Sequence, residues 1–322
     1  MPRMLIRKNP SDFKTLPLYV EATPEGLSYQ SIGMPLNFAQ TLQKRRPVTV
    51  ADNERFSLEL ANLGVSIRLT LHWQGRDYWV LVRQRRQDRG DVVLKLISGY
   101  VPAHEVNLPL HTAIQEIAEE CLLETPEGWL SGRFNDTWLP APYAAALHYR
   151  EALPFRLTPL SGATRPVSCG SQPLLERPRT YVHLPTASLQ LIYDLRLEVP
   201  REAKSLSLFH VEERLEGDQL VARLDRKRPD LYLIPLTEGQ PCAELYTLSK
   251  DRLQPASTRG VRLAESFAPQ DGWVVHDERI RWKDWVRQQG LTPPKPESRL
   301  KRLTGKARQI FRKVVRAKSP SP

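Results

Sequence analysis

The chain has 322 residues with 40% hydrophobic and 26% charged residues, ordinary values for a soluble globular protein that buries one large core or two smaller ones. No run approaches the roughly 18 apolar residues of a membrane-spanning helix, the first residues do not resemble a secretory signal, and three widely spaced cysteines form no CxxC pair. These features argue against a membrane span, a disulfide scaffold and a zinc site, and they predict a cytoplasmic protein.

The net charge of +11 is concentrated at one end of the chain. Residues 290–322 contain five Lys and five Arg against one acid, Glu297, and so carry +9. The first 289 residues carry only +2, which disfavours a nucleic-acid-binding face on the folded body.

The N-terminal part predicts an extension, residues 1–63, that packs on the core. It is rich in proline and has short strand-like pieces; a helix is expected over Arg55–Leu63, after the capping residues 51–54 and before Gly64. Val65–Trp73 and Tyr78–Arg85 then alternate with aromatic and β-branched residues, which predicts a β-hairpin.

A strand, a loop and a helix are expected next. Asp91–Ile97 is apolar and β-branched, and residues 99–108 form the loop. Pro109–Glu124 has helical apolar spacing. The apolar positions are Leu110, Ala113, Ile114, Ile117, Ala118, Cys121 and Leu122.

Three carboxylates, Glu116, Glu119 and Glu120, are expected to share one exposed surface of this helix. Like charges at helical spacing cost about 0.2–0.5 kcal/mol per pair unless solvent or a cation offsets them. Because divalent cations favour clustered oxygen ligands, a magnesium site is one interpretation. The simpler alternative is an ordinary amphipathic helix with a solvated acidic face.

This stretch resembles a Nudix box, in which Gly, five residues, Glu, seven residues and Arg-Glu-apolar-x-Glu-Glu-x-Gly-apolar form a loop-helix-loop. Gly99 and Glu105 have the family's spacing. The matching helix positions are Glu116, Ile117, Glu119, Glu120 and Leu123. Three features depart from the family: nine residues rather than seven follow Glu105, Gln115 replaces the arginine, and Leu122 replaces the glycine.

The resemblance implies Mg²⁺-dependent hydrolysis, with Mn²⁺ as an alternative cofactor, of a nucleoside diphosphate linked to another moiety. Glu116, Glu119 and Glu120 would hold the metal together with the backbone carbonyl of Gly99. Glu105 completes the implied catalytic set by orienting the helix. In the family an arginine pairs with this loop glutamate; Gln115 could only offer it a neutral hydrogen bond. The general base is not located. The candidates for it are Glu212, Glu213 and the helix glutamates.

Beyond Pro126, residues 153–187 are proline-rich and are interpreted as a long loop or insertion. Strands are expected at Ser188–Glu198, Ser205–Val211, Leu220–Leu224 and Leu231–Ile234. Cys242–Leu253 is similar to the strand and short helix that close many Nudix domains. The expected fold class is therefore α/β (α+β), with a Nudix-like mixed sheet sandwiched between helices. The expected Nudix-like domain covers residues 64–255.

The C-terminal part predicts two further segments. In residues 256–290, Trp273, Trp282 and Trp285 favour a short helix packed on the body over a surface that stacks on bases. Residues 291–322 are expected to form a proline linker and a basic amphipathic tail. The helical pattern of Ser298–Lys318 predicts that the tail binds an anionic membrane surface, a nucleic acid or an acidic partner. A solvated tail that binds nothing specific is equally compatible with the pattern.

The sequence thus leaves three functions open. The first is a Mg²⁺-dependent hydrolase, and the second is a Nudix-like binding module with weakened catalysis, which Gln115 and Leu122 favour. The third is a peripheral membrane or nucleic-acid-associated protein that acts through the tail.

Overall fold

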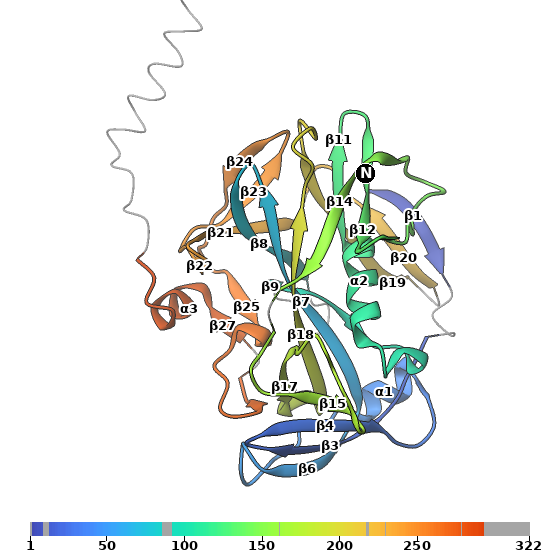
Figure 1. Ribbon diagram of the computed structural model, residues 1–322, viewed down its shortest axis with the longest axis vertical. Helices are drawn as coiled ribbons and strands as arrows, with labels where there is room; N and C mark the ends of the chain where they lie inside the picture. The colour runs from blue at the N-terminus through green and yellow to red at the C-terminus, as the bar shows by residue number, and fades with distance from the viewer. Residues whose placement is uncertain are drawn as a thin grey trace, which may run out of the picture.

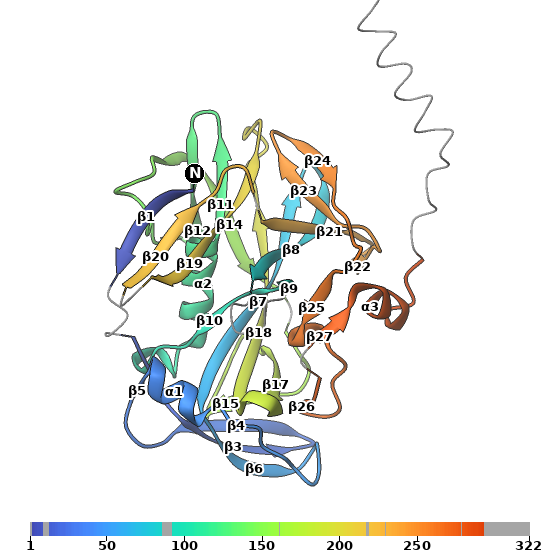
Figure 2. The same cartoon turned by 180° about the vertical axis from the view of Figure 1, so that it is seen from behind.

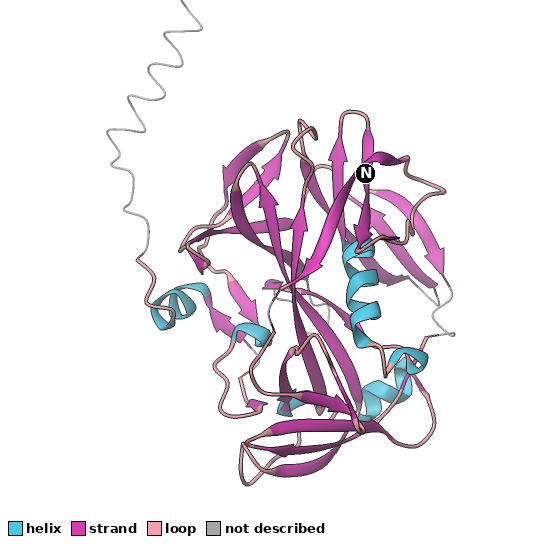
Figure 3. Cartoon of the chain, in the orientation of Figure 1, coloured by secondary structure: helices cyan, strands magenta, loops and turns pink. Residues whose placement is uncertain are grey.

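The computed structural model describes residues 2–8, 13–85, 92–160, 162–216, 219–228, 230–277 and 279–292. Strand accounts for 52% of the residues and helix for 13%, so the fold is a mixed α+β fold in which sheets dominate (Figure 3). The described residues contain three α-helices, none of which is long and apolar enough to cross a membrane. The predicted tail helix, 298–318, lies outside the described part of the chain.

A long strand, β7 (Asn62–Trp73), organises the molecule (Figure 1). It pairs along its length with parallel β18 (Ser188–Glu198), and its two ends pair with antiparallel β10 (Ile97–Tyr100) and β8 (Arg76–Arg85). Ten of the 12 residues of β7 and seven of the 11 residues of β18 are buried, as expected for central strands that are covered on both faces.

The two faces of β7 contact different parts of the chain. Val65, Ile67 and Leu69 belong to the main core, to which Ala113 and Ile117 of α2 (Pro109–Glu120) also belong. The opposite face carries Ser66, Arg68 and Thr70. A second core, which includes residues of α3 (Trp282–Gln288), lies on that side.

Further strands join the sheet in three groups: one next to β8, one next to β18, and one that begins after α2 in the chain. From β8 run β9 (Val92–Lys95), β21 (Leu231–Thr237), β22 (Gln240–Pro241), β23 (Tyr246–Ser249), β24 (Arg252–Pro255), β25 (Arg262–Ala264) and β27 (Arg279–Arg281). From β18 run β17 (Arg179–His183), β26 (Val274–Val275), β14 (Tyr149–Pro159), β12 (Gly128–Phe134) and β13 (Thr137–Trp138). After α2 come β11 (Cys121–Thr125) and its neighbours β19 (Ser207–Glu216), β20 (Gln219–Leu224) and β1 (Arg3–Lys8).

A smaller five-stranded sheet lies at the bottom of Figure 1. Its strands are β3 (Leu18–Thr23), β4 (Gly26–Ser31), β6 (Phe56–Leu60), β15 (Val167–Cys169) and β16 (Gln172–Pro173). Next to it are β2 (Lys14–Thr15), β5 (Leu36–Asn37) and α1 (Phe38–Lys44). The helix predicted over Arg55–Leu63 is wrong, because Phe56, Leu58 and Leu60 alternate with polar residues and pair with β3 as a strand.

The predicted helix Pro109–Glu124 is too long by four residues. Cys121 has extended backbone angles (φ −117°, ψ 94°) and begins β11, which pairs with β19. Cys121 and Leu123 enter the main core while Leu122 enters a third cluster with Trp129 and Phe209. A strand buries residues on alternate sides in this way, whereas a helix would not.

Two other predictions from sequence are wrong. Residues 153–187 are not one long loop, because they contribute most of β14 and all of β15, β16 and β17. The described residues also contain three short 3₁₀ turns. These turns are Ala103–Glu105, Leu184–Thr186 and Glu265–Phe267. Cys242–Leu253 contains no helix; β23 and β24 form a hairpin whose turn residues Lys250 and Asp251 have positive φ.

Most predicted strands are confirmed. The hairpin of β7 and β8 forms at Gln74-Gly75, and Ser188–Glu198 has the bounds of β18. Ser205–Val211, Leu220–Leu224 and Leu231–Ile234 correspond to β19, β20 and β21. Asp91–Ile97 is divided between β9 and β10, and Asp91 itself lies outside the described residues.

The tryptophans of the C-terminal segment are structural. Trp273, Trp282 and Trp285 are 2%, 5% and 2% exposed, so their rings are packed in the body. Figure 2 shows α3 beside β25 and β27 at the side of the molecule. The alternative that these rings stack on bases is therefore wrong.

Candidate functional site

Glu105 fastens the first turn of α2 to the loop before it. Its carboxylate is buried, with 7% of the residue exposed. His111 Nδ1 lies 2.7 Å from Glu105 Oε1, and the Thr112 hydroxyl donates to Oε2 over 2.6 Å. The sequence left open a neutral hydrogen bond from Gln115, but the residues about one turn earlier meet the carboxylate, because Glu105 lies under the N-terminal end of the helix.

Gly99 lies directly beneath Glu116. A Cβ atom on Gly99 would be 1.8 Å from Glu116 Oε1 and 2.2 Å from its Cδ. Gly99 pairs with Val65 in the sheet, so the Glu116 side chain lies against the backbone of β10. Close approach of a carboxylate to this strand thus requires glycine.

Gly99→Ala should displace Glu116 without unfolding the protein. The atoms that an added methyl group would meet belong to the end of a flexible side chain, so the free energy of unfolding should change by about 1 kcal/mol or less. Any activity or cation binding that depends on Glu116 should fall at least tenfold. Thermal unfolding and Mn²⁺ titration of the variant would measure both effects. Unchanged Mn²⁺ affinity would contradict a role for this contact.

Glu116 and Glu120 form a coupled pair of carboxylates. Burial and the negative charges of Glu120 and Glu119 raise the pKa of Glu116 well above its usual value. Burial acts on Glu120 too, but the positive charge of Lys95 and the His210 imidazole outweigh it and lower the Glu120 pKa. Where Glu120 has lost its proton, Glu116 therefore still holds one.

His210 and Lys95 complete the cluster. The side chains of His210 and Glu120 are 8% and 17% exposed, and His210 Nε2 lies 3.7 Å from Glu120 Oε2. Neither of these two atoms has a hydrogen-bond partner among the described residues. Lys95 Nζ donates to Ser98 Oγ over 2.9 Å. The Glu213 charge also acts on Glu116, which places one of the candidate bases near the cluster.

Glu116→Gln should stabilise the protein at neutral pH and have little effect near pH 4. A raised pKa in the folded state means that Glu116 contributes stability below its unfolded pKa and loses it as pH rises through the folded pKa. The stability gained on removing the carboxylate should therefore grow as the pH rises from 4 to 8.

Denaturant unfolding of this variant at pH 4, 6 and 8 would test the sign. Glu212→Gln is the matched control, because Glu212 forms an exposed ion pair with Arg214. A stability gain for Glu116→Gln that is constant across this pH range would contradict a raised Glu116 pKa in the folded protein.

The predicted site residues are thus brought together only in part. Gly99, Glu116, Glu119 and Glu120 lie around the second half of α2, while Glu105 is bound at its beginning. At about 1.5 Å per helical residue, Thr112, which holds Glu105, and Glu116 are about 6 Å apart along the helix axis, roughly one turn.

The sequence predicted that the three glutamates share an exposed surface. In the structure each of them is partly buried instead. Within the described ranges, no three His, Cys, Asp or Glu side chains are arranged to hold a metal ion. The chemistry of the donors nevertheless suits a hard cation: they are oxygens, Glu120 Oε2 is buried without a partner, and their mutual repulsion raises the Glu116 pKa.

Sequence reasoning missed Lys95 and His210. Each is a single ionisable residue inside an apolar run, Val-Val-Leu-Lys-Leu-Ile and Leu-Phe-His-Val, respectively. A charged group in a strand of this kind is unusual, because buried charges need partners. That signal could have identified both residues, although the sequence did not reveal that α2 supplies their partners.

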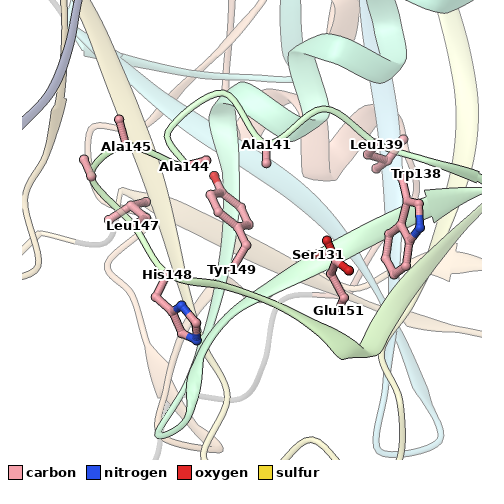
Figure 4. Close-up of a pocket in the computed structure, with 11 residues that line it drawn as sticks. Ser131, Trp138, Leu139, Ala141, Ala144, Ala145, Leu147, His148, Tyr149 and Glu151 are labelled. Atoms are coloured by element: carbon pink, nitrogen blue, oxygen red, sulfur yellow. The ribbon is translucent and has the colours of Figure 1, made fainter.

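A cavity of about 500 Å³ lies beyond the C-terminal end of α2, between β12, β13, β14 and residues 139–148 (Figure 4). Trp138, Ser131 and Glu151 form one side of it, and Tyr149 and His148 lie on the other. Tyr143, from the same 139–148 segment, donates its hydroxyl to the Glu119 carbonyl over 3.2 Å. The wall of this cavity is thereby attached to the helix that carries the glutamates.

No model of a known protein family and no curated protein sequence matches this chain.

Proposed function

We propose that the protein is a divergent Nudix-like hydrolase that cleaves a nucleoside diphosphate linked to another moiety and requires Mg²⁺ or Mn²⁺. The observation that carries the proposal is the partly buried pair of Glu116, which lies against Gly99, and Glu120. Holding like charges together in a partly buried place is unfavourable, and a divalent cation is the ligand that would offset this cost. The Nudix-like sandwich belongs to the same proposal and is supported by the central sheet having α2 on one face and α3 on the other.

Glu116, Glu119 and Glu120 would hold the cation, with the Gly99 carbonyl as a further ligand. When bound, the cation would neutralise phosphate oxygens and polarise the attacking water. Glu105 holds the start of α2 through His111 and Thr112 and so positions the helix. Glu213, which acts electrostatically on the cluster, is the candidate we favour for accepting a proton from water.

A binding module that has lost catalysis is the second candidate. Lys95 supports it, because a lysine ammonium that stabilises ionised Glu120 supplies part of the positive charge that a metal would supply. Gln115 and Leu122 at the divergent positions point the same way, as does the lack of a three-ligand arrangement in the described part of the chain.

A Mn²⁺ titration and a hydrolysis screen separate the two candidates. The purified full-length chain would be titrated with Mn²⁺ by calorimetry and then incubated with a panel of nucleoside diphosphate conjugates in Mg²⁺ or Mn²⁺. A hydrolase should bind the cation and release a nucleoside monophosphate from at least one conjugate. Cation binding without turnover would favour the binding module, and no cation binding would contradict the proposed metal site.

A further inference from the structure

The second face of the central sheet contains a cavity that the carboxylate cluster does not explain. It has a volume of about 560 Å³ and lies between β7, β8 and β17 on one side and residues 266–270 with α3 on the other. Its walls include Arg68, Arg179, Trp79, Phe267, Trp285 and Gln288. No Asp or Glu is among the described residues that line it.

Two arginines of this cavity share one carboxylate. Asp194, 6% exposed, forms a bidentate pair with Arg68, with distances of 2.6 Å and 2.7 Å. Arg179 Nη2 lies 3.6 Å from the same carboxylate, which is already bound by Arg68. Asp194 is therefore bound more closely by Arg68 than by Arg179.

Arg179 is the group with unused binding capacity. Its Nε is buried and has no hydrogen-bond partner among the described residues. Burial and the neighbouring Arg68 charge lower the Arg179 pKa, so the surroundings disfavour its cationic form. The Arg179 side chain as a whole is 33% exposed, so part of it faces the cavity that it lines, where an anion would offset its charge.

The remaining walls suit a flat ring. Arg68 lies over Trp79, with its guanidinium carbon 5.1 Å from the ring centroid. Phe267 and Trp285 meet edge-to-face at 6.1 Å and 89°. Gln288 adds an amide that can donate and accept hydrogen bonds. Cavities of several hundred Å³ with aromatic walls and few polar groups are typical of small-molecule sites.

We propose that this cavity binds an aromatic phosphate of the nucleoside monophosphate class, with the phosphate on Arg179 and the ring against the partly exposed Trp79 and Phe267. The fork of a guanidinium matches phosphate oxygens in a bidentate way, and aromatic walls stack on planar rings. The proposal is independent of the hydrolase proposed above, because it uses the opposite face of the sheet and no metal.

Calorimetry on the full-length chain would test it, with AMP, adenosine and inorganic phosphate as separate probes. EDTA is present throughout, so that cation-dependent binding near Glu116 does not contribute. AMP should bind at least tenfold more tightly than adenosine or phosphate. Arg179→Gln should weaken AMP binding at least tenfold, and Arg179→Lys, which keeps the charge and loses the fork, should be intermediate.

The fold should survive both changes, because Arg68 and Asp194 remain paired, and Arg179→Gln also removes the repulsion between two arginines. Thermal unfolding checks this, and a rise in the wild-type melting temperature with AMP gives a second readout. Arg201→Gln, on an exposed turn, is the control and should bind AMP as the wild type does. The proposal is overturned if AMP does not bind, if adenosine or phosphate binds as tightly as AMP, or if folded Arg179→Gln binds AMP as tightly as the wild type.

Discussion

Glu120→Gln should lower cation-dependent hydrolysis by about 100-fold or more while leaving the protein folded. Substitutions around metal ligands already cost about 10–100-fold, and this one removes a charged ligand in the proposed site. The amide keeps the shape of the side chain and removes a charge that repels Glu116. Glu119→Gln should have a similar effect on the rate.

Initial rates on the conjugate identified by the screen would measure this loss, with circular dichroism to confirm folding. Glu127→Gln is a matched control, because Glu127 is 61% exposed and pairs with Arg150 in a turn away from the cluster. Rates at the wild-type level in both the Glu119 and Glu120 variants would remove these residues from the mechanism.

Trp285→Ala should reduce the free energy of unfolding by about 3–5 kcal/mol, the usual cost of truncating a large buried aromatic side chain. Trp285 is 2% exposed and packs against Trp282, with ring centroids 5.2 Å apart, and against Phe267. Its loss opens a large hole between α3 and the second face of the sheet. Urea unfolding monitored by far-ultraviolet circular dichroism would give the change.

Trp138→Ala provides the comparison for this effect. Trp138 is 40% exposed and contacts mainly Arg133, whose guanidinium carbon lies 4.2 Å from its ring centroid. We expect its replacement to cost about 1 kcal/mol, as for an exposed cation–π contact. If Trp285→Ala cost no more than this, α3 would not be an integral part of the second core.

The sequence predicts local elements well where a period is strong. The alternating residues of β7, β8 and β18 identify these strands, and the apolar spacing after Pro109 identifies α2. It fails where pairing with a distant segment decides the conformation. Cys121 leaves the helix because β19 pairs with it, and Phe56–Leu60 is a strand because β3 is beside it.

The candidate site shows the same division. The spacing of Gly99, Glu105 and the three glutamates could be seen in the sequence, and Gly99 does lie against Glu116. His111 and Thr112 as partners of Glu105, and Lys95 and His210 beside Glu120, could not, because they depend on how the loop and β19 meet the helix. Binding by Ser298–Lys318 to an anionic membrane or nucleic acid stays a prediction.

The parallel pairing of β7 with β18 also constrains the order in which the molecule assembles. Asn62 pairs with Ser188, so the segment that carries α2 must be made and folded back before the two strands can join. Such non-local contacts close slowly, because the entropy of a long loop is lost before the contacts form. Arg68 and Asp194 beside the cavity come from these two strands, and β10, whose Gly99 lies against Glu116, pairs with β7. A nascent chain that ends before Ser188 therefore lacks the framework for either one, and the two sites on opposite faces of the sheet should mature together late in folding.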